Sequence, residues 1–304
     1  MQLPNNFASM GESRAWHRPP GQAYRGGFDD PAVAWHDQVM IRGVLLDLSG
    51  VIYVGTHVLP GAKDALSRLR DAGLAIRFLT NSTRVPKKDI LARLRQMGIV
   101  IAGEELFTPA EVARELLAHR KRSPHLLIHP DLMEDFQGLA AHAARAVVIG
   151  DAGPAFTFEA LNAAFRELVA GADFLALASN RYFRDDDGGL SLDAGAFVAA
   201  LEFASRRRAE ILGKPSAGFF AAALASMSCD AADAVMIGDD AEMDVSGALV
   251  AGLGCALLVR TGKYLPGAEK DVDPGPTAVV DDLPAAVQWI LDRSGQASPG
   301  AARA

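Results

Sequence analysis

Short runs of consecutive apolar residues alternate with segments of helical periodicity along most of this chain. The runs predict strands, and the periodic segments predict helices. We expect strands at 44–47, 75–80, 234–238 and 255–260, and helices at 62–71, after Pro86, and at 217–227, 243–251 and 283–291. Strands that are apolar on both faces and separated by helices are typical of a parallel sheet covered on both sides. The pattern therefore predicts an α/β fold with a doubly wound, Rossmann-like parallel-sheet core.

The middle of the chain has strands and helices of its own. Apolar runs at 125–129, 146–150 and 173–179 alternate with helical stretches at 158–169 and 197–205. We interpret this region as an α/β cap inserted between two halves of one core domain. The predicted parts are a disordered leader (1–38), the first core half (39–108), the cap (109–205), the second core half (206–292) and a flexible tail (293–304).

Composition and charge exclude several classes of protein. Half of the 304 residues are hydrophobic, enough to bury a sizeable core. No apolar run approaches the roughly 20 residues that cross a bilayer, and no signal-peptide layout is present, so we expect a cytoplasmic protein without a membrane partner. The net charge is −7 and no long basic stripe occurs, which argues against nucleic acid as a partner. The two cysteines form no motif.

Polar side chains follow four of the expected strands at the point where each strand ends. Asp47 ends the run in GVLLDLSGVIYVG, and the later segments are FLTNST (78–83), LGKPS (212–216) and VMIGDD (235–240). Parallel sheets bind ligands beyond the carboxyl ends of their strands. We therefore expect these four segments to converge on one site.

The residue types in these segments suit phosphoryl transfer. Asp47 could attack phosphorus and form an aspartyl-phosphate, or it could merely cap a turn. The Thr80 hydroxyl and the Asn81 backbone N–H could hold phosphoryl oxygens, although this segment, Ser82 above all, would also serve as a helix N-cap. The Lys214 ammonium could balance the charge of the phosphoryl group and the nucleophile; the alternative is an ordinary surface lysine in a turn before Pro215.

Adjacent carboxylates after a buried strand repel each other unless a cation lies between them. Asp239 and Asp240 form such a pair, and Mg²⁺ prefers a few carboxylates together with water and substrate phosphate. We assign Asp239 as a ligand and Asp240 as a secondary candidate, while Asp244 could instead hydrogen-bond Lys214. The acidic run 185–187 precedes two glycines and is interpreted as an exposed hairpin turn.

The order and spacing of the four segments resemble the haloacid dehalogenase superfamily of phosphohydrolases. The insertion resembles the C2-type cap of subclass IIA, the NagD-like phosphatases. DLSGVIY, RFLTNST, SNRYF, GKPSAGFF, VMIGDD and VRTGKY further resemble the group of phospholysine phosphohistidine inorganic pyrophosphate phosphatases and their relatives, from about 41 to 291. The resemblance implies an Asp47 nucleophile and Mg²⁺ held by Asp47, Asp239 and the Ser49 carbonyl. It also implies a homodimer formed through the cap.

One position departs from the superfamily pattern. Most of these phosphatases carry a second aspartate two residues after the nucleophile, which protonates the leaving group, and Ser49 stands there in this chain. A serine hydroxyl is a poor acid near neutral pH, so leaving groups that need little protonation should be favoured. Pyrophosphate expels phosphate, which is such a leaving group, and the nitrogen of the P–N bonds in phosphohistidine and phospholysine can itself be protonated before cleavage.

Two questions stay open at the level of the sequence. Asn180 and Arg181, in the cap, are candidates for substrate selection, but an ordinary loop explains them equally well. The chain could also be a catalytically weak regulatory or interaction protein on a phosphatase scaffold. A metal-independent 2-haloacid dehalogenase is a third reading, against which the acidic segment at 238–240 argues.

Overall fold

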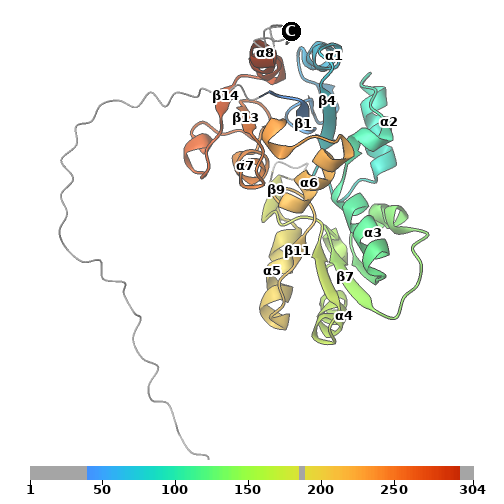
Figure 1. The fold of residues 1–304 in the computed structure, drawn as a ribbon. Helices are drawn as coiled ribbons and strands as arrows, with labels where there is room; N and C mark the ends of the chain where they lie inside the picture. The colour runs from blue at the N-terminus through green and yellow to red at the C-terminus, as the bar shows by residue number, and fades with distance from the viewer. Residues whose placement is uncertain (1–39, 185–188, 295–304) are drawn as a thin grey trace, which may run out of the picture. The chain divides into compact units, whose positions relative to one another are not determined.

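The computed structural model describes residues 40–184 and 189–294, and all that follows concerns these residues (Figure 1). The predicted leader, the acidic run 185–187 and residues 295–304 of the predicted tail lie outside the described residues. The last helix, α8 (Leu283–Ser294), continues two residues beyond the predicted end of the core at 292.

The core is a six-stranded sheet in the order β14-β13-β12-β1-β4-β5, and every neighbouring pair of strands is parallel. This confirms the predicted doubly wound parallel sheet. Its strands are β1 (Gly43–Asp47), β4 (Ala75–Leu79), β5 (Leu106–Phe107), β12 (Ala234–Gly238), β13 (Cys255–Val259) and β14 (Ala278–Val280).

Helices cover both faces of this sheet, and the side chains of β1 show why the strand had to be apolar throughout. Val44 and Leu46 pack into one core cluster, whereas Leu45 packs into the cluster on the opposite face. Burying each such side chain contributes about 1.5–3 kcal/mol. The first face carries α1 (Ala62–Asp71), α2 (Lys87–Gln96) and α8, and the second carries α6 (Ala217–Ser226) and α7 (Gly247–Val250).

A second, four-stranded parallel sheet has the order β11-β8-β7-β6. Its strands are β6 (Ser123–Leu127), β7 (Arg145–Ile149), β8 (Asp173–Ala176) and β11 (Glu210–Ile211), flanked by α3 (Pro109–Arg120), α4 (Phe158–Val169) and α5 (Ala194–Ser205). The predicted insertion, 109–205, contains all of these elements except β11. The second sheet thus extends to Ile211, because β11 pairs with β8 rather than with a core strand.

Two short hairpins complete the strands that the structure describes. The pair β2 (Tyr53–Val54) and β3 (His57–Val58) follows the loop after β1, and β9 (Tyr182–Arg184) pairs with β10 (Leu190–Leu192) beside α5. The helix predicted at 243–251 begins with a π-helical turn, η5 (Ala241–Ser246), before α7. These elements are too short for apolar periodicity to reveal them.

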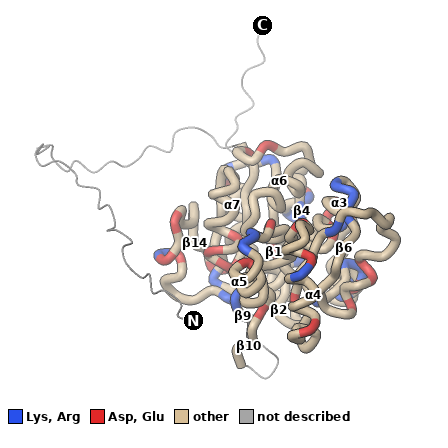
Figure 2. Tube along the Cα trace, turned by 90° about the horizontal axis from the view of Figure 1, so that it is seen from below, with Lys and Arg blue, Asp and Glu red and all other residues tan. Residues whose placement is uncertain are grey.

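Ion pairs join the loop after β4 and the start of α2 to the second sheet and its connections. Arg84 Nε lies 2.5 Å from Asp151 Oδ2, and Lys88 Nζ lies 2.5 Å from Glu134 Oε2. Lys and Arg are interspersed with Asp and Glu along the trace (Figure 2). No helix in the described part of the chain is long and apolar enough to traverse a bilayer.

Candidate active site

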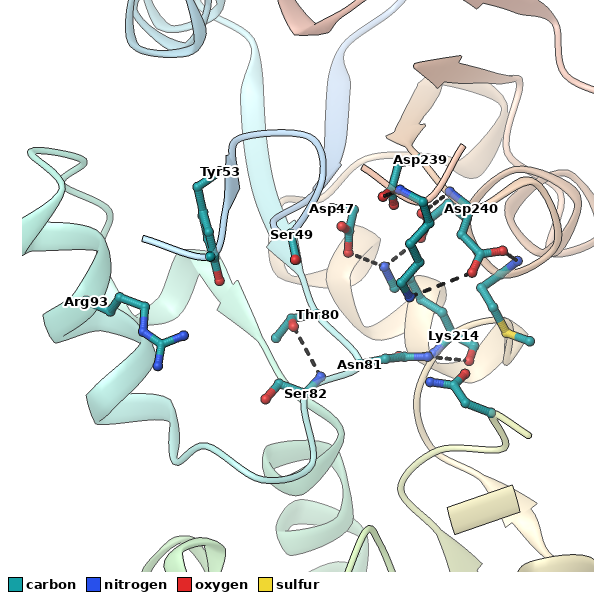
Figure 3. A pocket seen from close by; sticks show the side chains of 15 residues that line it. Asp47, Ser49, Tyr53, Thr80, Asn81, Ser82, Arg93, Lys214, Asp239 and Asp240 are labelled. Atoms are coloured by element: carbon teal, nitrogen blue, oxygen red, sulfur yellow. Dashed lines mark hydrogen bonds and ion pairs between the residues drawn. The ribbon is translucent and has the colours of Figure 1, made fainter. Parts of the chain in front are cut away.

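Asp47, Lys214 and Asp244 form a buried ionic cluster beyond the carboxyl end of β1 (Figure 3). Lys214 Nζ donates to Asp47 Oδ1 and also to Asp244 Oδ1, at 2.5 Å in the second case. The three residues expose only 7%, 3% and 1% of their surface. Buried charges are costly unless they are paired and hydrogen-bonded, so the interpretation of Lys214 as an ordinary surface lysine is wrong.

Asp239 completes a set of three carboxylates. One oxygen each from Asp47, Asp239 and Asp244 lies within 4.8 Å of the other two. The backbone N–H of Lys263, in the loop after β13, donates to Asp239 Oδ2 at 2.7 Å. Asp239 follows β12 directly, and β12 neighbours β1 in the sheet, so strand order brings the carboxylates together.

Two glycines make room for the Asp239 carboxylate. A Cβ on Gly50 would lie 1.9 Å from Asp239 Oδ2, and one on Gly262 would lie 2.0 Å from the same atom. Both residues have positive φ, +91° and +61°, which L side chains rarely adopt. The loops after β1 and β13 can therefore approach Asp239 only because glycine stands at both positions.

The crowding of carboxylates shifts their protonation. Burial, followed by the charges of Asp47 and Asp244, raises the pKa of Asp239 to about 7. Burial also raises the pKa of Asp244 to about 6, although the Lys214 ammonium opposes this. Burial lowers the pKa of Lys214, but the carboxylates of Asp244 and Asp47 outweigh it and raise the pKa above its ordinary value. Lys214 is therefore a fixed positive charge.

Asp244 has both carboxylate oxygens engaged by the protein. Oδ1 accepts from Lys214, and Oδ2 accepts from the backbone N–H of Asp240 at 3.2 Å. This is the arrangement expected if Asp244 orients the lysine. Asp240 itself caps η5, because its Oδ1 accepts from the backbone N–H groups of Glu242 and Met243 at 3.1 and 3.0 Å.

The segment after β4 lines the cavity and forms hydrogen bonds to the loop that carries Lys214. The Asn81 side chain donates to the Lys214 carbonyl and accepts from the Lys214 N–H, both at 2.8 Å. Thr80 Oγ1 accepts from the backbone N–H of Ser82 at 3.1 Å. Thr80 and Asn81 both face the cavity that contains Asp47. The Asn81 side chain thus has a structural role that the sequence did not indicate.

Ser49 also lines the cavity and is exposed, in the loop between β1 and β2. Thr261 Oγ1 donates to the neighbouring carbonyl of Gly50, which ties this loop to the one after β13.

The two cap candidates lie in different surroundings. Asn180 lines the cavity, whereas Arg181 is exposed and is not among the lining residues. The close approach of α5 holds the Asn180 backbone, since a Cβ on Gly195 would lie 2.5 Å from the Asn180 carbonyl oxygen.

The lining also includes Tyr53, Arg93, Met243 and Lys263, which were not predicted as site residues. Lys263 follows the carboxyl end of β13, so the rule that located the other segments could have found it. Tyr53 lies on a two-residue strand, and Arg93 lies on a helix with several exposed basic residues. No pattern in the sequence distinguishes either of them.

The donor set fits a small, hard divalent cation. Three buried carboxylates with one lysine leave a net charge of about −2 when all are ionised, and oxygen ligands are those that Mg²⁺ prefers. Burial, followed by repulsion from Asp47 and Asp244, raises the pKa of Asp239, and a dication would favour its ionised form.

Comparison with known proteins gives the family. A model described as haloacid dehalogenase-like hydrolase matches residues 44–162, and a second, HAD-hydrolase-like, matches 211–286. Haloacid dehalogenase-like hydrolase domain-containing protein 2 of Rattus norvegicus is 42% identical over 252 residues, which cover 83% of this chain and 96% of the relative. The chain belongs to the haloacid dehalogenase-like hydrolase family.

Further relatives of this haloacid dehalogenase-like hydrolase are named phosphatases. The phospholysine phosphohistidine inorganic pyrophosphate phosphatase of Danio rerio is 41% identical over 257 residues, covering 83% of this chain and 94% of the relative. Among solved structures, a 4-nitrophenylphosphatase from Thermotoga maritima matches with a TM-score of 0.75 and 26% identity, over 83% of this chain and 98% of that chain. The predicted assignment to a phosphatase-type enzyme is confirmed.

Two more solved structures are informative. NagD of E. coli, at 23% identity, shares the fold with a TM-score of 0.72 over 81% of this chain and 98% of its own. A glycerol phosphate phosphatase from Mycobacterium tuberculosis, in complex with magnesium, matches with a TM-score of 0.71 and 25% identity, over 82% of this chain and 78% of that chain. The predicted capped fold is confirmed.

Proposed function

We propose that this chain is a Mg²⁺-dependent phosphohydrolase that works through an aspartyl-phosphate on Asp47, with pyrophosphate or P–N phosphoramidates as substrates. The observation that carries the proposal is the buried cluster in which Lys214 holds the Asp47 carboxylate beside Asp239. The relatives named as phospholysine phosphohistidine inorganic pyrophosphate phosphatases support the choice of substrate.

In this mechanism the chain's own groups position the reactants. Asp47 Oδ attacks phosphorus, and the bond from phosphorus to the leaving group breaks with its electron pair going to the leaving group. Lys214 balances the charge of nucleophile and phosphoryl group, which would otherwise repel each other. The Thr80 hydroxyl and the Asn81 backbone N–H contact phosphoryl oxygens. Asp244 keeps the lysine in place.

Asp47, Asp239 and the Ser49 carbonyl would hold Mg²⁺. When bound, the ion would neutralise charge on the transferred phosphoryl group. The Lys263 N–H orients Asp239 for this role, as do the two glycines beside it.

The residue at position 49 selects among substrates. Ser49 stands at the position where the resemblance places a general acid, and general acid catalysis is worth typically 10²- to 10⁴-fold. Alkyl phosphates, which expel a basic alkoxide, should therefore be poor substrates. Phosphate and imidazole leave without that help. The cavity, about 320 Å³, lies at the small end of the roughly 300–1,000 Å³ range of ligand sites, which favours compact substrates.

A substrate panel tests the proposal. Pyrophosphate, phosphohistidine, phospholysine and simple alkyl phosphates would be assayed with and without Mg²⁺. We expect turnover of the first three only with Mg²⁺, and little turnover of the alkyl esters. Activity on haloacids that survives EDTA would favour a dehalogenase instead, and no turnover of any compound would favour a regulatory protein. A homodimer through the cap and a cytoplasmic location belong to the same proposal, and sedimentation analysis tests the dimer.

A further inference from the structure

Arg93 is a cation in the cavity wall to which the mechanism above gives no task. It projects from α2, and its side chain lines the cavity together with Tyr53 and Ser82. Figure 3 shows Arg93 and Tyr53 across the cavity from Asp47 and Lys214, with Thr80 and Ser82 between.

The other two cations of the cavity already face carboxylates. Lys214 pairs with Asp47 and Asp244, and Lys263 Nζ lies 3.9 Å from Asp240 Oδ2. Within residues 40–184 and 189–294, the guanidinium of Arg93 forms no ion pair and no hydrogen bond. Its charge is felt inside the cavity, because the guanidinium opposes the rise in the pKa of Tyr53 that burial causes. An unpaired guanidinium that faces a substrate cavity is a ready partner for a second anion.

Arg93 lies on the side of the cavity opposite Asp47, and this position bears on which group of the substrate it can contact. In an in-line displacement the nucleophile and the leaving group lie on opposite sides of phosphorus. With Asp47 as nucleophile, the group that departs points away from Asp47, towards the wall formed by Arg93 and Tyr53. Ser49 supplies no proton to that group, so a positive charge there would be the means of stabilising it.

We propose that Arg93 binds an anionic leaving group, so that the preferred substrates are phosphoryl compounds whose leaving group carries negative charge of its own, pyrophosphate being the simplest. This inference rests on the proposed function, and it narrows the substrate class within it. In pyrophosphate cleavage the bond from Asp47 Oδ to phosphorus forms, the bridging P–O bond breaks, and inorganic phosphate departs with the electron pair into the reach of Arg93.

The test compares two substrates with weakly basic leaving groups: the leaving group of pyrophosphate is already negatively charged in the substrate, whereas that of 4-nitrophenyl phosphate is neutral until the P–O bond breaks. We would measure kcat/KM for pyrophosphate and for 4-nitrophenyl phosphate in the wild type, Arg93→Gln, Arg93→Lys and Arg95→Gln. Arg95 is the matched control, because it is an exposed arginine on the same helix that does not line the cavity.

We expect Arg93→Gln to lower kcat/KM for pyrophosphate about tenfold, the size of a charge-assisted contact partly screened by solvent. The same variant should change kcat/KM for 4-nitrophenyl phosphate by less than about twofold. Arg93→Lys should recover part of the loss on pyrophosphate, and Arg95→Gln should have the kcat/KM values of the wild type. Equal losses on both substrates, or no loss on pyrophosphate, would overturn the inference.

A binding measurement separates this inference from the proposed function. Calorimetry with Mg²⁺ would compare methylenediphosphonate, a diphosphate that cannot be hydrolysed, with methylphosphonate, which has one anionic group. Arg93→Gln should weaken only the first, by about tenfold. If the wild type hydrolyses no phosphoryl compound, the proposed function fails, yet this binding comparison still decides the role of Arg93. Weaker binding of both ligands, or of neither, in Arg93→Gln would refute that role.

Discussion

Binding of Mg²⁺ to the carboxylate cluster should release protons, and the number released follows from the structure. The pKa of Asp239 is about 7 and that of Asp244 about 6, both raised by burial and by neighbouring carboxylates. A dication bound beside them favours the ionised forms, so protons that these carboxyls hold in the metal-free protein leave on binding.

The expected stoichiometry depends on pH. Each Mg²⁺ bound should release about one proton or more at pH 6, fewer at pH 7 and close to none at pH 8.5, because the protonated share of Asp239 and Asp244 falls over this interval. The affinity for Mg²⁺ should rise over the same interval, because protons compete with the ion.

Isothermal titration calorimetry measures this directly. Titrations of the metal-free protein with MgCl₂ in buffers of different ionisation enthalpy, at the three pH values, give the number of protons released from the slope of apparent enthalpy against buffer enthalpy. The titration at pH 8.5 is the internal control. Binding without proton release at pH 6 and 7 would refute the argument that burial, together with neighbouring carboxylates, raises the pKa values of Asp239 and Asp244.

Three further predictions concern activity and stability. Asp47→Asn should lower turnover of pyrophosphate by at least about 10³-fold with unchanged circular dichroism; wild-type rates in this variant would contradict the assignment of the nucleophile. Gly262→Ala should weaken Mg²⁺ binding by at least about tenfold, because its Cβ would lie 2.0 Å from Asp239 Oδ2 and would displace this ligand. Gly252→Ala is the control for backbone strain alone, because Gly252 also has a positive φ but a Cβ there would meet nothing within 4 Å. Calorimetry would measure the Mg²⁺ affinity of both variants. Equal affinities would contradict the crowding of the Asp239 carboxylate. Without divalent ions the free energy of unfolding should fall as pH rises from about 4 to about 7, because the native state keeps protons on Asp239 and Asp244 that the unfolded chain loses near pH 4. Urea unfolding across this pH range tests the sign, and saturating Mg²⁺ should remove the decline.

The sequence alone determined the architecture of the core and the members of the ionic cluster. Continuous apolar runs such as Val44–Leu46 are stable only between two layers of helices, so the sheet followed from local patterning. Asp47 ends one such run and Asp239 directly follows another, and neighbouring parallel strands bring their carboxyl ends to the same edge of the sheet. Those positions are set by chain direction and strand pairing, which local sequence reports well.

Only the tertiary structure decided how the remaining groups meet. The structure chose the pairing with Lys214 among the roles that the sequence left open for Asp244. The hydrogen bonds from Asn81 to the Lys214 backbone and the position of Arg93 at the cavity had no sequence signal. Such contacts depend on the packing of loops and helix faces against one another, and a side chain's type does not indicate which way it will point once a helix is packed. The sequence thus names the chemistry of the site, whereas packing decides which charges are paired and which are left to receive a substrate.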